Sequence, residues 1–275
     1  MRIIINTTFE CNLKCEYCYL HSKNTKSVID ECKYQYRKPN EWIEGILWLE
    51  KQFEEISVID ISGGEPFLYK GIIELIKKIP ERIIIGITTN TLLISESFFL
   101  LPDEKKKKIC IVLSAHLVDG KLPDVFIKKI IDIKNNFRNI NINFVTYPRQ
   151  DDFINYIKEI SDRIGIRISF EPYIDYNSEK KHFGFTDYAS LFFSPYDRRG
   201  IELSNKRKLP SECFIGTKYL WITPDGNINQ CLGRFLERKE PIGNIFKKEM
   251  HKRPESVISC DIFCPCTQNW RDDNQ

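Results

Sequence analysis

The feature that most constrains the fold is an alternation of short apolar runs with longer amphipathic stretches over residues 1–172. Six runs rich in Ile and Val span 3–8, 58–62, 82–88, 109–114, 141–146 and 166–171. Such continuous apolar runs are typical of parallel strands that are covered on both faces. Helical spacing of apolar residues occurs between them, over 41–53, 72–79, 95–100, 125–137 and 153–163. Right-handed crossovers would curl these repeats into an α/β fold, a partial (β/α)6 TIM-like barrel.

The pattern changes after residue 172. Residues 173–212 are rich in aromatic side chains and give little regular signal. Two further apolar runs, 219–223 and 227–230, flank a Pro-Asp-Gly turn and predict a β-hairpin. We therefore expect three regions: the barrel over 1–172, an aromatic-rich linker over 173–212, and a small cysteine-rich unit with the hairpin over 213–275.

Charge and hydropathy exclude two classes of protein. The 41 Lys and Arg residues nearly balance the 38 Asp and Glu residues, so the clustered positive charge of a duplex nucleic-acid binder is not expected. No apolar run approaches the roughly 18 residues of a membrane span, and the N-terminal run is too short for a signal peptide. We expect no membrane association and a cytoplasmic location.

The ten cysteines are clustered. Three lie at Cys11, Cys15 and Cys18, and five lie at Cys213, Cys231, Cys260, Cys264 and Cys266. Clustered thiols in a reducing compartment indicate a metal site rather than disulfides, and thiolates select zinc or iron–sulfur clusters. A closed zinc site needs four ligands. The first cluster offers three, which suits an open catalytic position, although a zinc knuckle is the alternative.

Polar motifs or residues lie at the carboxyl ends of the first four predicted strands. Cys11-Asn12-Leu13-Lys14-Cys15-Glu16-Tyr17-Cys18 follows the first strand, and Ser62-Gly63-Gly64-Glu65-Pro66 follows the second. Asn90 follows the third strand and Ser114 ends the fourth. Barrel folds place their active sites at these carboxyl ends. The C-x3-C-x2-C spacing with an aromatic residue before the last cysteine, together with the GGEP motif, resembles the radical S-adenosylmethionine (SAM) superfamily.

The resemblance implies two cofactors, S-adenosyl-L-methionine and a [4Fe–4S] cluster. The three cysteines would ligate the cluster, leaving one iron open to SAM. Reductive cleavage of SAM would then give a 5′-deoxyadenosyl radical that abstracts a hydrogen atom, with a flavodoxin- or ferredoxin-type protein as electron donor. The residues expected to bind SAM are Tyr17, Gly63, Gly64, Glu65, Asn90 and Ser114.

Four of these SAM-binding positions also have an ordinary structural interpretation. The glycine pair suits a tight strand-to-helix turn with positive φ, and Asn90 and Ser114 suit local capping. A buried Glu65 carboxylate requires a partner. The ammonium group of SAM would provide one.

The C-terminal cysteines resemble those of twitch and SPASM domains, which hold auxiliary iron–sulfur clusters. Cys213 and Cys231 bracket the hairpin in the pattern C-x12-G-x4-C. We expect them to ligate an auxiliary cluster together with Cys264 and Cys266, with Cys260 as the competing ligand. A zinc ribbon that stabilises the tail is the alternative.

The resemblance favours a peptide-modifying enzyme. The alternatives are a radical SAM dehydrogenase or epimerase of a small metabolite, a glycyl-radical activating enzyme, and a zinc- or iron–sulfur-binding interaction or electron-carrier protein. Because the first predicted strand begins close to Met1, we expect a separate leader-peptide-binding protein to recognise a peptide substrate.

Other residues suggest structural roles. Cys32 is expected to be a spectator, and Cys110 a small core residue within a strand. The segment 105–108 is expected to be a solvated connection from a helix to a strand. His182, Arg198 and Arg199 could bind an anionic group near a substrate cavity, but we favour solvated surface for them.

Overall fold

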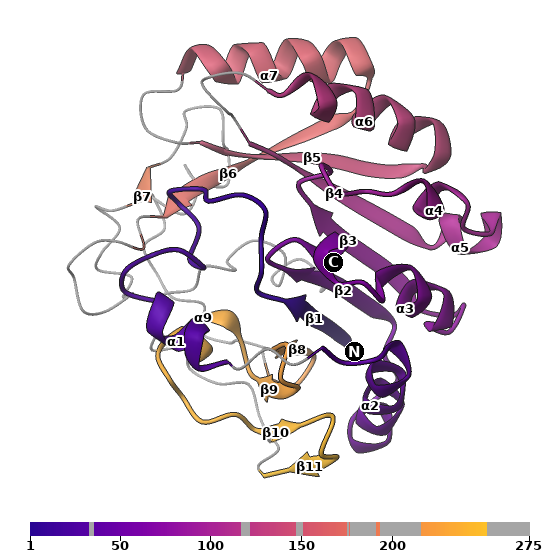
Figure 1. Ribbon diagram of the computed structural model, residues 1–275, viewed down its shortest axis with the longest axis vertical. Helices are drawn as coiled ribbons and strands as arrows, with labels where there is room; N and C mark the ends of the chain where they lie inside the picture. Colours follow the sequence, from indigo (N-terminus) through magenta and orange to yellow (C-terminus); the bar gives the residue numbers. More distant parts are fainter. Residues whose placement is uncertain are drawn as a thin grey trace.

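The computed structural model describes residues 1–32, 36–116, 122–146, 151–174, 176, 191–192 and 216–251. They form one sheet in the order β11-β10-β9-β8-β1-β2-β3-β4-β5-β6-β7 (Figure 1). Six parallel strands make its centre: β1 (Arg2–Thr8), β2 (Val58–Gly63), β3 (Ile84–Thr89), β4 (Ile109–Ala115), β5 (Asn139–Thr146) and β6 (Arg167–Ile174). All six predicted strands are therefore present, in the predicted parallel arrangement.

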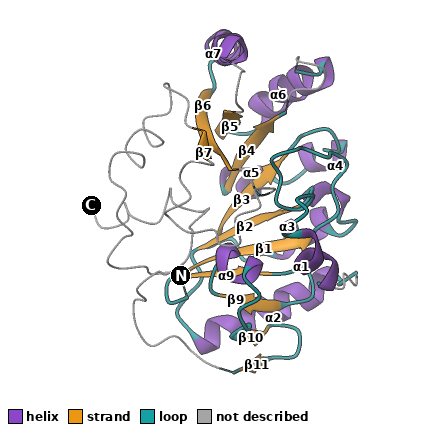
Figure 2. Ribbon diagram, turned by 90° about the vertical axis from the view of Figure 1, so that its left-hand side faces the viewer, coloured by secondary structure: helices purple, strands orange, loops and turns teal. Residues whose placement is uncertain are grey.

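The crossover helices cover the outer face of this curved sheet, whereas α1 (Lys26–Glu31) lies beside α9 (Leu232–Leu236) away from them (Figures 1 and 2). The crossover helices are α2 (Pro39–Gln52), α3 (Ile72–Lys78), α4 (Glu96–Phe99), α6 (Asp124–Asn136) and α7 (Asp151–Ile164), which match the five predicted ones. Four short helical segments of the described chain were not predicted: α1, the 3-10 turn η1 (Pro66–Leu68), α5 (Asp103–Lys107) and, in the tail, α9. The arrangement confirms the predicted α/β partial barrel.

The segment 105–108 leads from α5 to β4 with Lys107 and Lys108 exposed, as predicted, but its first residue is not solvated. Lys105 lies in α5 with only 7% of its surface exposed. Its Nζ donates a hydrogen bond to the backbone oxygen of Ile79 at 2.6 Å. Burial lowers the pKa of this ammonium group. The long side chain therefore ties α5 to the end of α3, which a run of four lysines does not reveal.

The predicted hairpin is present and continues the same sheet. It consists of β8 (Tyr219–Ile222) and β9 (Asn227–Asn229), and β8 pairs in parallel with β1. Two short strands follow, β10 (Gly243–Asn244) and β11 (Glu249–Met250). At the other edge, β7 (Leu191–Phe192) pairs antiparallel to β6. The beginning of the tail is thus hydrogen-bonded directly to the first barrel strand.

The core is built from fully buried branched side chains on one face of the central strands, where register partners align, rather than on both faces as the continuous apolar runs suggested. Ile3, Ile59 and Ile85 have no exposed surface, and each contributes about 1.5–3 kcal/mol through burial. Tail residues belong to the same core: Ile245 packs against α2, and Phe246 contacts the ring of Trp42 edge-on with centroids 4.9 Å apart. Barrel and hairpin therefore share one hydrophobic core.

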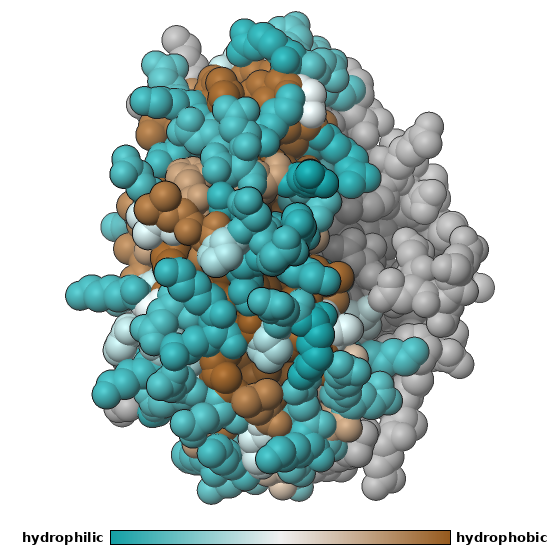
Figure 3. Space-filling view, turned by 90° about the vertical axis from the view of Figure 1, so that its right-hand side faces the viewer, coloured by the Kyte–Doolittle hydropathy of each residue, from teal (hydrophilic) through white to brown (hydrophobic). Residues whose placement is uncertain are grey.

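The helix-covered side of the molecule is mostly hydrophilic, with apolar side chains between the charged ones (Figure 3). Leu100 is the most exposed large apolar residue there in the described chain, at 79%. Scattered exposure of this kind is normal for a globular surface. In the part of the chain that the structure describes, no helix is long and apolar enough to span a membrane.

Candidate active site

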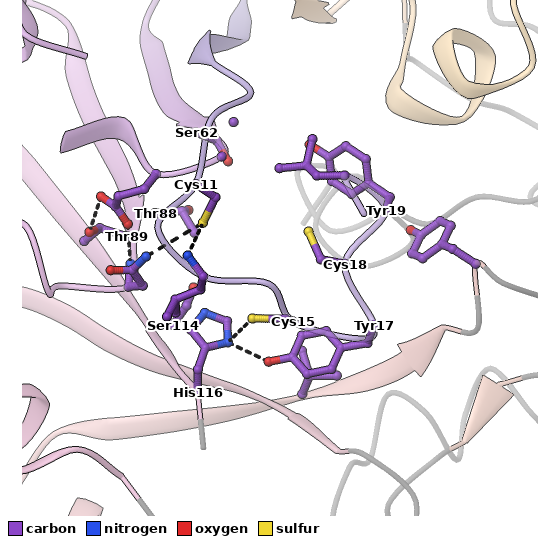
Figure 4. A pocket seen from close by; sticks show the side chains of 18 residues that line it. Cys11, Cys15, Tyr17, Cys18, Tyr19, Ser62, Thr88, Thr89, Ser114 and His116 are labelled. Atoms are coloured by element: carbon purple, nitrogen blue, oxygen red, sulfur yellow. Dashed lines mark hydrogen bonds between the residues drawn. The ribbon is translucent and has the colours of Figure 1, made fainter. Parts of the chain in front are cut away.

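A cavity of about 290 Å³ opens at the carboxyl ends of the barrel strands. Its volume is near the lower end of the roughly 300–1,000 Å³ typical of small-molecule sites. Its wall contains all nine barrel residues expected to hold the cluster or SAM: Cys11, Cys15, Tyr17, Cys18, Gly63, Gly64, Glu65, Asn90 and Ser114. Residues more than 100 positions apart in the sequence thus meet at one site (Figure 4).

The loop after β1 carries the three thiols. Its turns are closed by backbone hydrogen bonds, such as the one from the Cys18 N–H to the Cys15 oxygen at 3.0 Å. The Cys11 sulfur accepts a hydrogen bond from the Leu13 N–H at 3.4 Å. Burial raises the pKa of all three thiols, that of Cys18 to about 12. Thiolates this buried need a compensating positive charge, which a bound metal supplies.

The arrangement of the sulfurs distinguishes two kinds of metal site. Figure 4 shows the Cys11, Cys15 and Cys18 side chains spread around the cavity. Among the described residues, no three His, Cys, Asp or Glu side chains converge closely enough to hold a single metal ion. Zinc would require its thiolates to meet at one point, whereas a cubane binds each on a different iron. The donor set therefore fits an iron–sulfur cluster better than a zinc knuckle.

The two glycines bring the β2 loop against the cysteine loop. Gly63 has φ +125°, and a Cβ there would also collide with the backbone oxygen of Thr8. A Cβ on Gly64 would collide with the backbone oxygen of Glu10. The Gly64 and Glu65 N–H groups donate to these same two oxygens, each at 2.8 Å. The predicted positive φ occurs at Gly63. Gly64 lacks a side chain, and this lets the β2 loop approach the cysteine loop closely.

Glu65 is fully buried, and protein donors contact both of its carboxylate oxygens. Oε1 accepts from the Thr89 hydroxyl at 2.8 Å and from the Phe67 N–H at 3.1 Å. Oε2 accepts from the Asn90 N–H at 2.8 Å. Burial raises the pKa of this carboxyl, and the three hydrogen bonds oppose the rise. Glu65 thus braces the ends of β2 and β3, a structural role that the sequence did not suggest.

Asn90 connects the third strand to the cysteine loop. Its Nδ2 donates to the Asn12 side-chain oxygen at 2.8 Å and lies 4.0 Å from the Cys11 sulfur. Its own Oδ1 accepts from the Leu92 N–H at 3.1 Å, so the residue caps locally as well. The structural and site interpretations of Asn90 are therefore compatible. Ser114 lines the cavity on β4.

His116 lines the cavity and was missed by the sequence analysis. Its Nδ1 lies 2.6 Å from the Tyr17 hydroxyl and 3.4 Å from the Cys15 sulfur. Burial lowers the pKa of His116 to about 4 and raises the pKa of Tyr17. Its place directly after β4, two residues beyond Ser114, was the signal that could have found it. The other unpredicted lining residues include Ser62, Thr88, Thr89 and Tyr176.

Cys231 lies outside this cavity, at the start of the tail helix α9 (Leu232–Leu236). Its sulfur accepts a hydrogen bond from the Arg234 N–H at 3.3 Å. One face of α9 packs beside the cysteine loop, because Leu236 shares a small apolar cluster with Leu20 and Tyr176. Cys213, Cys260, Cys264 and Cys266 lie outside the described residues, as do His182, Arg198 and Arg199.

The two isolated cysteines differ in their surroundings. Cys110 lies within the predicted strand, on β4, but it is half-buried and is not part of the hydrophobic core that was expected to hold it. Cys32 is buried beside the hairpin turn rather than in a polar surface stretch. Burial and the neighbouring Asp225 carboxylate raise the pKa of Cys32, to about 12. Neither residue lines the cavity described above.

Comparison with known proteins gives a family match over the barrel. Residues 5–176 match the family model described as "Radical SAM superfamily". Over 299 aligned residues the chain is 25% identical to GTP 3',8-cyclase of Clostridium perfringens (strain SM101 / Type A), covering 91% of this chain and 90% of the relative. It is 22% identical over 287 residues to the subtilosin biosynthesis protein AlbA of Bacillus subtilis, covering 94% of this chain and 60% of AlbA.

Solved structures share the fold. Streptococcus suis SuiB bound to its precursor peptide SuiA superposes with a TM-score of 0.65 and 21% identity. The match covers 90% of this chain and 62% of SuiB, so this chain spans less than two thirds of that protein. AdoMet-bound anSMEcpe matches with a TM-score of 0.62 and 18% identity, over 93% of this chain and 82% of that one.

Proposed function

Because the chain belongs to the radical SAM superfamily, we propose that Cys11, Cys15 and Cys18 hold its [4Fe–4S] cluster and that the adjoining cavity binds SAM. The family implies both cofactors. Together they supply a carbon-centred radical that abstracts a hydrogen atom from an unactivated carbon. The observation that carries the assignment is the meeting of all three thiols with the polar ends of β2, β3 and β4 in one cavity.

The chain's own residues would bind and orient the cofactor in this cavity. The Gly63-Gly64 backbone permits close approach, and the Glu65 carboxylate would face the ammonium group of SAM. Asn90 and Ser114 would offer polar contacts, and Tyr17 an aromatic wall. Except for Tyr17 on the cysteine loop, these residues follow or end rigid strands, which fixes their positions relative to the cofactor. Water and stray thiols would have to be excluded from the reacting atoms by the bound cofactor and substrate.

The substrate that we favour is a peptide or protein side chain. No Lys or Arg occurs among the described residues that line the cavity, whereas Leu13, Tyr19 and Val145 give it a partly apolar wall. Such a wall suits an uncharged segment better than a polyanion. Two relatives point the same way: AlbA is named for bacteriocin biosynthesis, and SuiB was solved with a precursor peptide. A separate leader-peptide-binding protein would then present the substrate.

A guanine nucleotide is the second candidate, favoured by the similarity to GTP 3',8-cyclases over about 90% of both chains. A triphosphate requires cationic partners. The described wall of the cavity offers none, so Arg198 and Arg199, outside the described residues, would have to provide them. The two candidates therefore differ in their dependence on these arginines.

We also propose an auxiliary iron–sulfur cluster in the tail region 213–275, after the linker over 173–212. Cys213 and Cys231 would ligate it with Cys264 and Cys266, and Cys260 would be the competing ligand. The position of Cys231 supports this, because its helix packs on the loop that carries Cys18. A flavodoxin- or ferredoxin-type protein would supply electrons to the enzyme.

A turnover experiment separates the two substrates. The anaerobically reconstituted full chain is mixed with dithionite and SAM, and then with GTP or with synthetic peptides corresponding to short open reading frames next to its gene. We expect the peptide, but not GTP, to accelerate 5′-deoxyadenosine formation and to change mass. Stimulation by GTP alone, lost in an Arg198→Ala/Arg199→Ala variant, would show that the nucleotide is the substrate and the peptide assignment is wrong.

A further inference from the structure

Three side chains form a hydrogen-bonded group at one side of the cavity. His116, directly after β4, places its Nδ1 2.6 Å from the Tyr17 hydroxyl and 3.4 Å from the Cys15 sulfur (Figure 4). The rings of His116 and Tyr17 are nearly parallel, with an angle of 20° between their planes. The contact joins the end of β4 to the cysteine loop, about 100 residues earlier in the chain. Neither the GGEP motif nor the cysteine spacing accounts for this histidine.

One arrangement of the hydrogen atoms in this group satisfies the sulfur and the hydroxyl together. A metal-bound thiolate only accepts hydrogen bonds, so the Cys15 sulfur needs a donor. The Tyr17 hydroxyl, whose side chain is hydrogen-bonded to Cys15, has one hydrogen, which it donates to the sulfur. Its oxygen can then accept a hydrogen from Nδ1 of His116. This order satisfies both the sulfur and the hydroxyl, and it assigns the His116 proton to Nδ1.

We propose that His116 is a positioning residue that directs the Tyr17 hydroxyl onto the Cys15 thiolate and thereby raises the reduction potential of the cluster. The proposal rests on the proposed ligation of the cluster by Cys15. Reduction adds one electron, and part of its charge falls on the ligand sulfurs. A hydrogen bond to a sulfur therefore stabilises the reduced cluster more than the oxidised one, and hydrogen bonding to sulfur is an established determinant of cluster potential.

The test is a redox titration of the reconstituted full chain. Dithionite donates the electron, and electron paramagnetic resonance follows the reduced cluster that Cys11, Cys15 and Cys18 would hold. For His116→Phe we expect a reduction equilibrium about tenfold less favourable, which is a midpoint about 59 mV lower for one electron. His116→Asn should restore most of the shift, because its amide nitrogen can occupy the place of Nδ1. Tyr17→Phe should lower the midpoint similarly, and the double variant should add little, since both changes remove one interaction.

A matched control is His21→Phe, because the ring of His21 contacts the backbone oxygen of Leu13 rather than a thiol. Its midpoint should equal that of the unaltered chain. An iron-loaded His116→Phe variant with an unchanged midpoint would overturn the inference. If that variant does not hold iron, Tyr17→Phe decides, because it removes the same donor to sulfur. Failure of the unaltered chain to bind iron would instead overturn the proposed function.

Discussion

The cysteine loop and the tail hairpin are neighbours on one sheet, yet they define their sites to very different degrees. Both place a cysteine after a strand, Cys11 after β1 and Cys231 after β9, and β8 pairs directly with β1. The loop brings three thiols to one cavity within eight residues. The hairpin contributes Cys231 alone to the described structure. When the ligands of a site are close in sequence, local structure fixes their positions. When they come from distant segments, their positions depend on how the intervening chain folds.

The two regions nevertheless support each other. Phe9 leads into the cysteine loop and stacks on Trp221 of β8, with ring centroids 6.0 Å apart. Phe235 of α9 lies 5.9 Å from Phe9 and 4.9 Å from Trp221. This aromatic trio joins the loop to the tail, and aromatic pairs of this kind contribute about 0.5–1.5 kcal/mol beyond burial. A substitution in the loop can therefore alter the packing of the tail, and a substitution in the tail can alter the packing of the loop.

The largest effect is expected from the cysteine loop. Cys18→Ala should lose about four iron atoms per chain and all SAM cleavage, because two thiolates do not retain a cubane. Iron and sulfide quantification after anaerobic reconstitution measures this loss. Cys110→Ala is the matched control, since that thiol is also half-buried but lies on β4 away from the cavity wall. An equal loss of iron from both variants would contradict the assignment.

The tail should hold a separate set of iron atoms. Cys231→Ala and Cys213→Ala should each lose about four iron atoms while the first cluster remains, and Cys260→Ala should keep the full content. Iron analysis combined with electron paramagnetic resonance of the remaining cluster gives the comparison. If zinc rather than iron is lost from the Cys231→Ala protein, the tail is a zinc ribbon. Iron loss from Cys260→Ala would instead make Cys264 or Cys266 the spare thiol.

The glycine contacts can be tested without the cofactors. Gly64→Ala should destabilise the fold by on the order of 3 kcal/mol, because the new Cβ meets the Glu10 backbone beside the cysteine loop. Gly165→Ala is the control: it has φ +67°, but a Cβ there meets only the Lys134 side chain, at 3.3 Å. It should cost about 1 kcal/mol. Denaturant unfolding compares the two, and equal losses would show that close approach is unimportant.

The smallest effect is expected at Glu65. Glu65→Gln should weaken SAM binding by about 1–3 kcal/mol and leave the cluster spectrum intact, because it removes the charge and turns an amide NH2 toward a donor that the carboxylate accepted from. Equilibrium binding of SAM measures it. Thr89→Val is the control, since it removes one donor to the carboxylate and preserves its charge. If both variants bind SAM equally well, Glu65 acts only as a brace.

Much of the fold followed from periodicity, because buried parallel strands leave continuous apolar runs. The cavity wall was also predictable where residues follow a strand, as with Glu65 and Asn90. What escaped prediction depends on contacts made after folding. Lys105 gave no local sign of burial, and His116 becomes a site residue only because β4 ends opposite Tyr17. The tail ligands remain a prediction, since their spacing does not determine where distant segments meet.

The central claim is that the three-cysteine cavity cleaves SAM. The direct measurement is chromatographic quantification of 5′-deoxyadenosine from the anaerobically reconstituted full chain after addition of dithionite and SAM. The account predicts that the unaltered chain forms this product and that Cys18→Ala does not. An unaltered chain that holds its full iron complement and binds SAM, yet forms no 5′-deoxyadenosine, would contradict it.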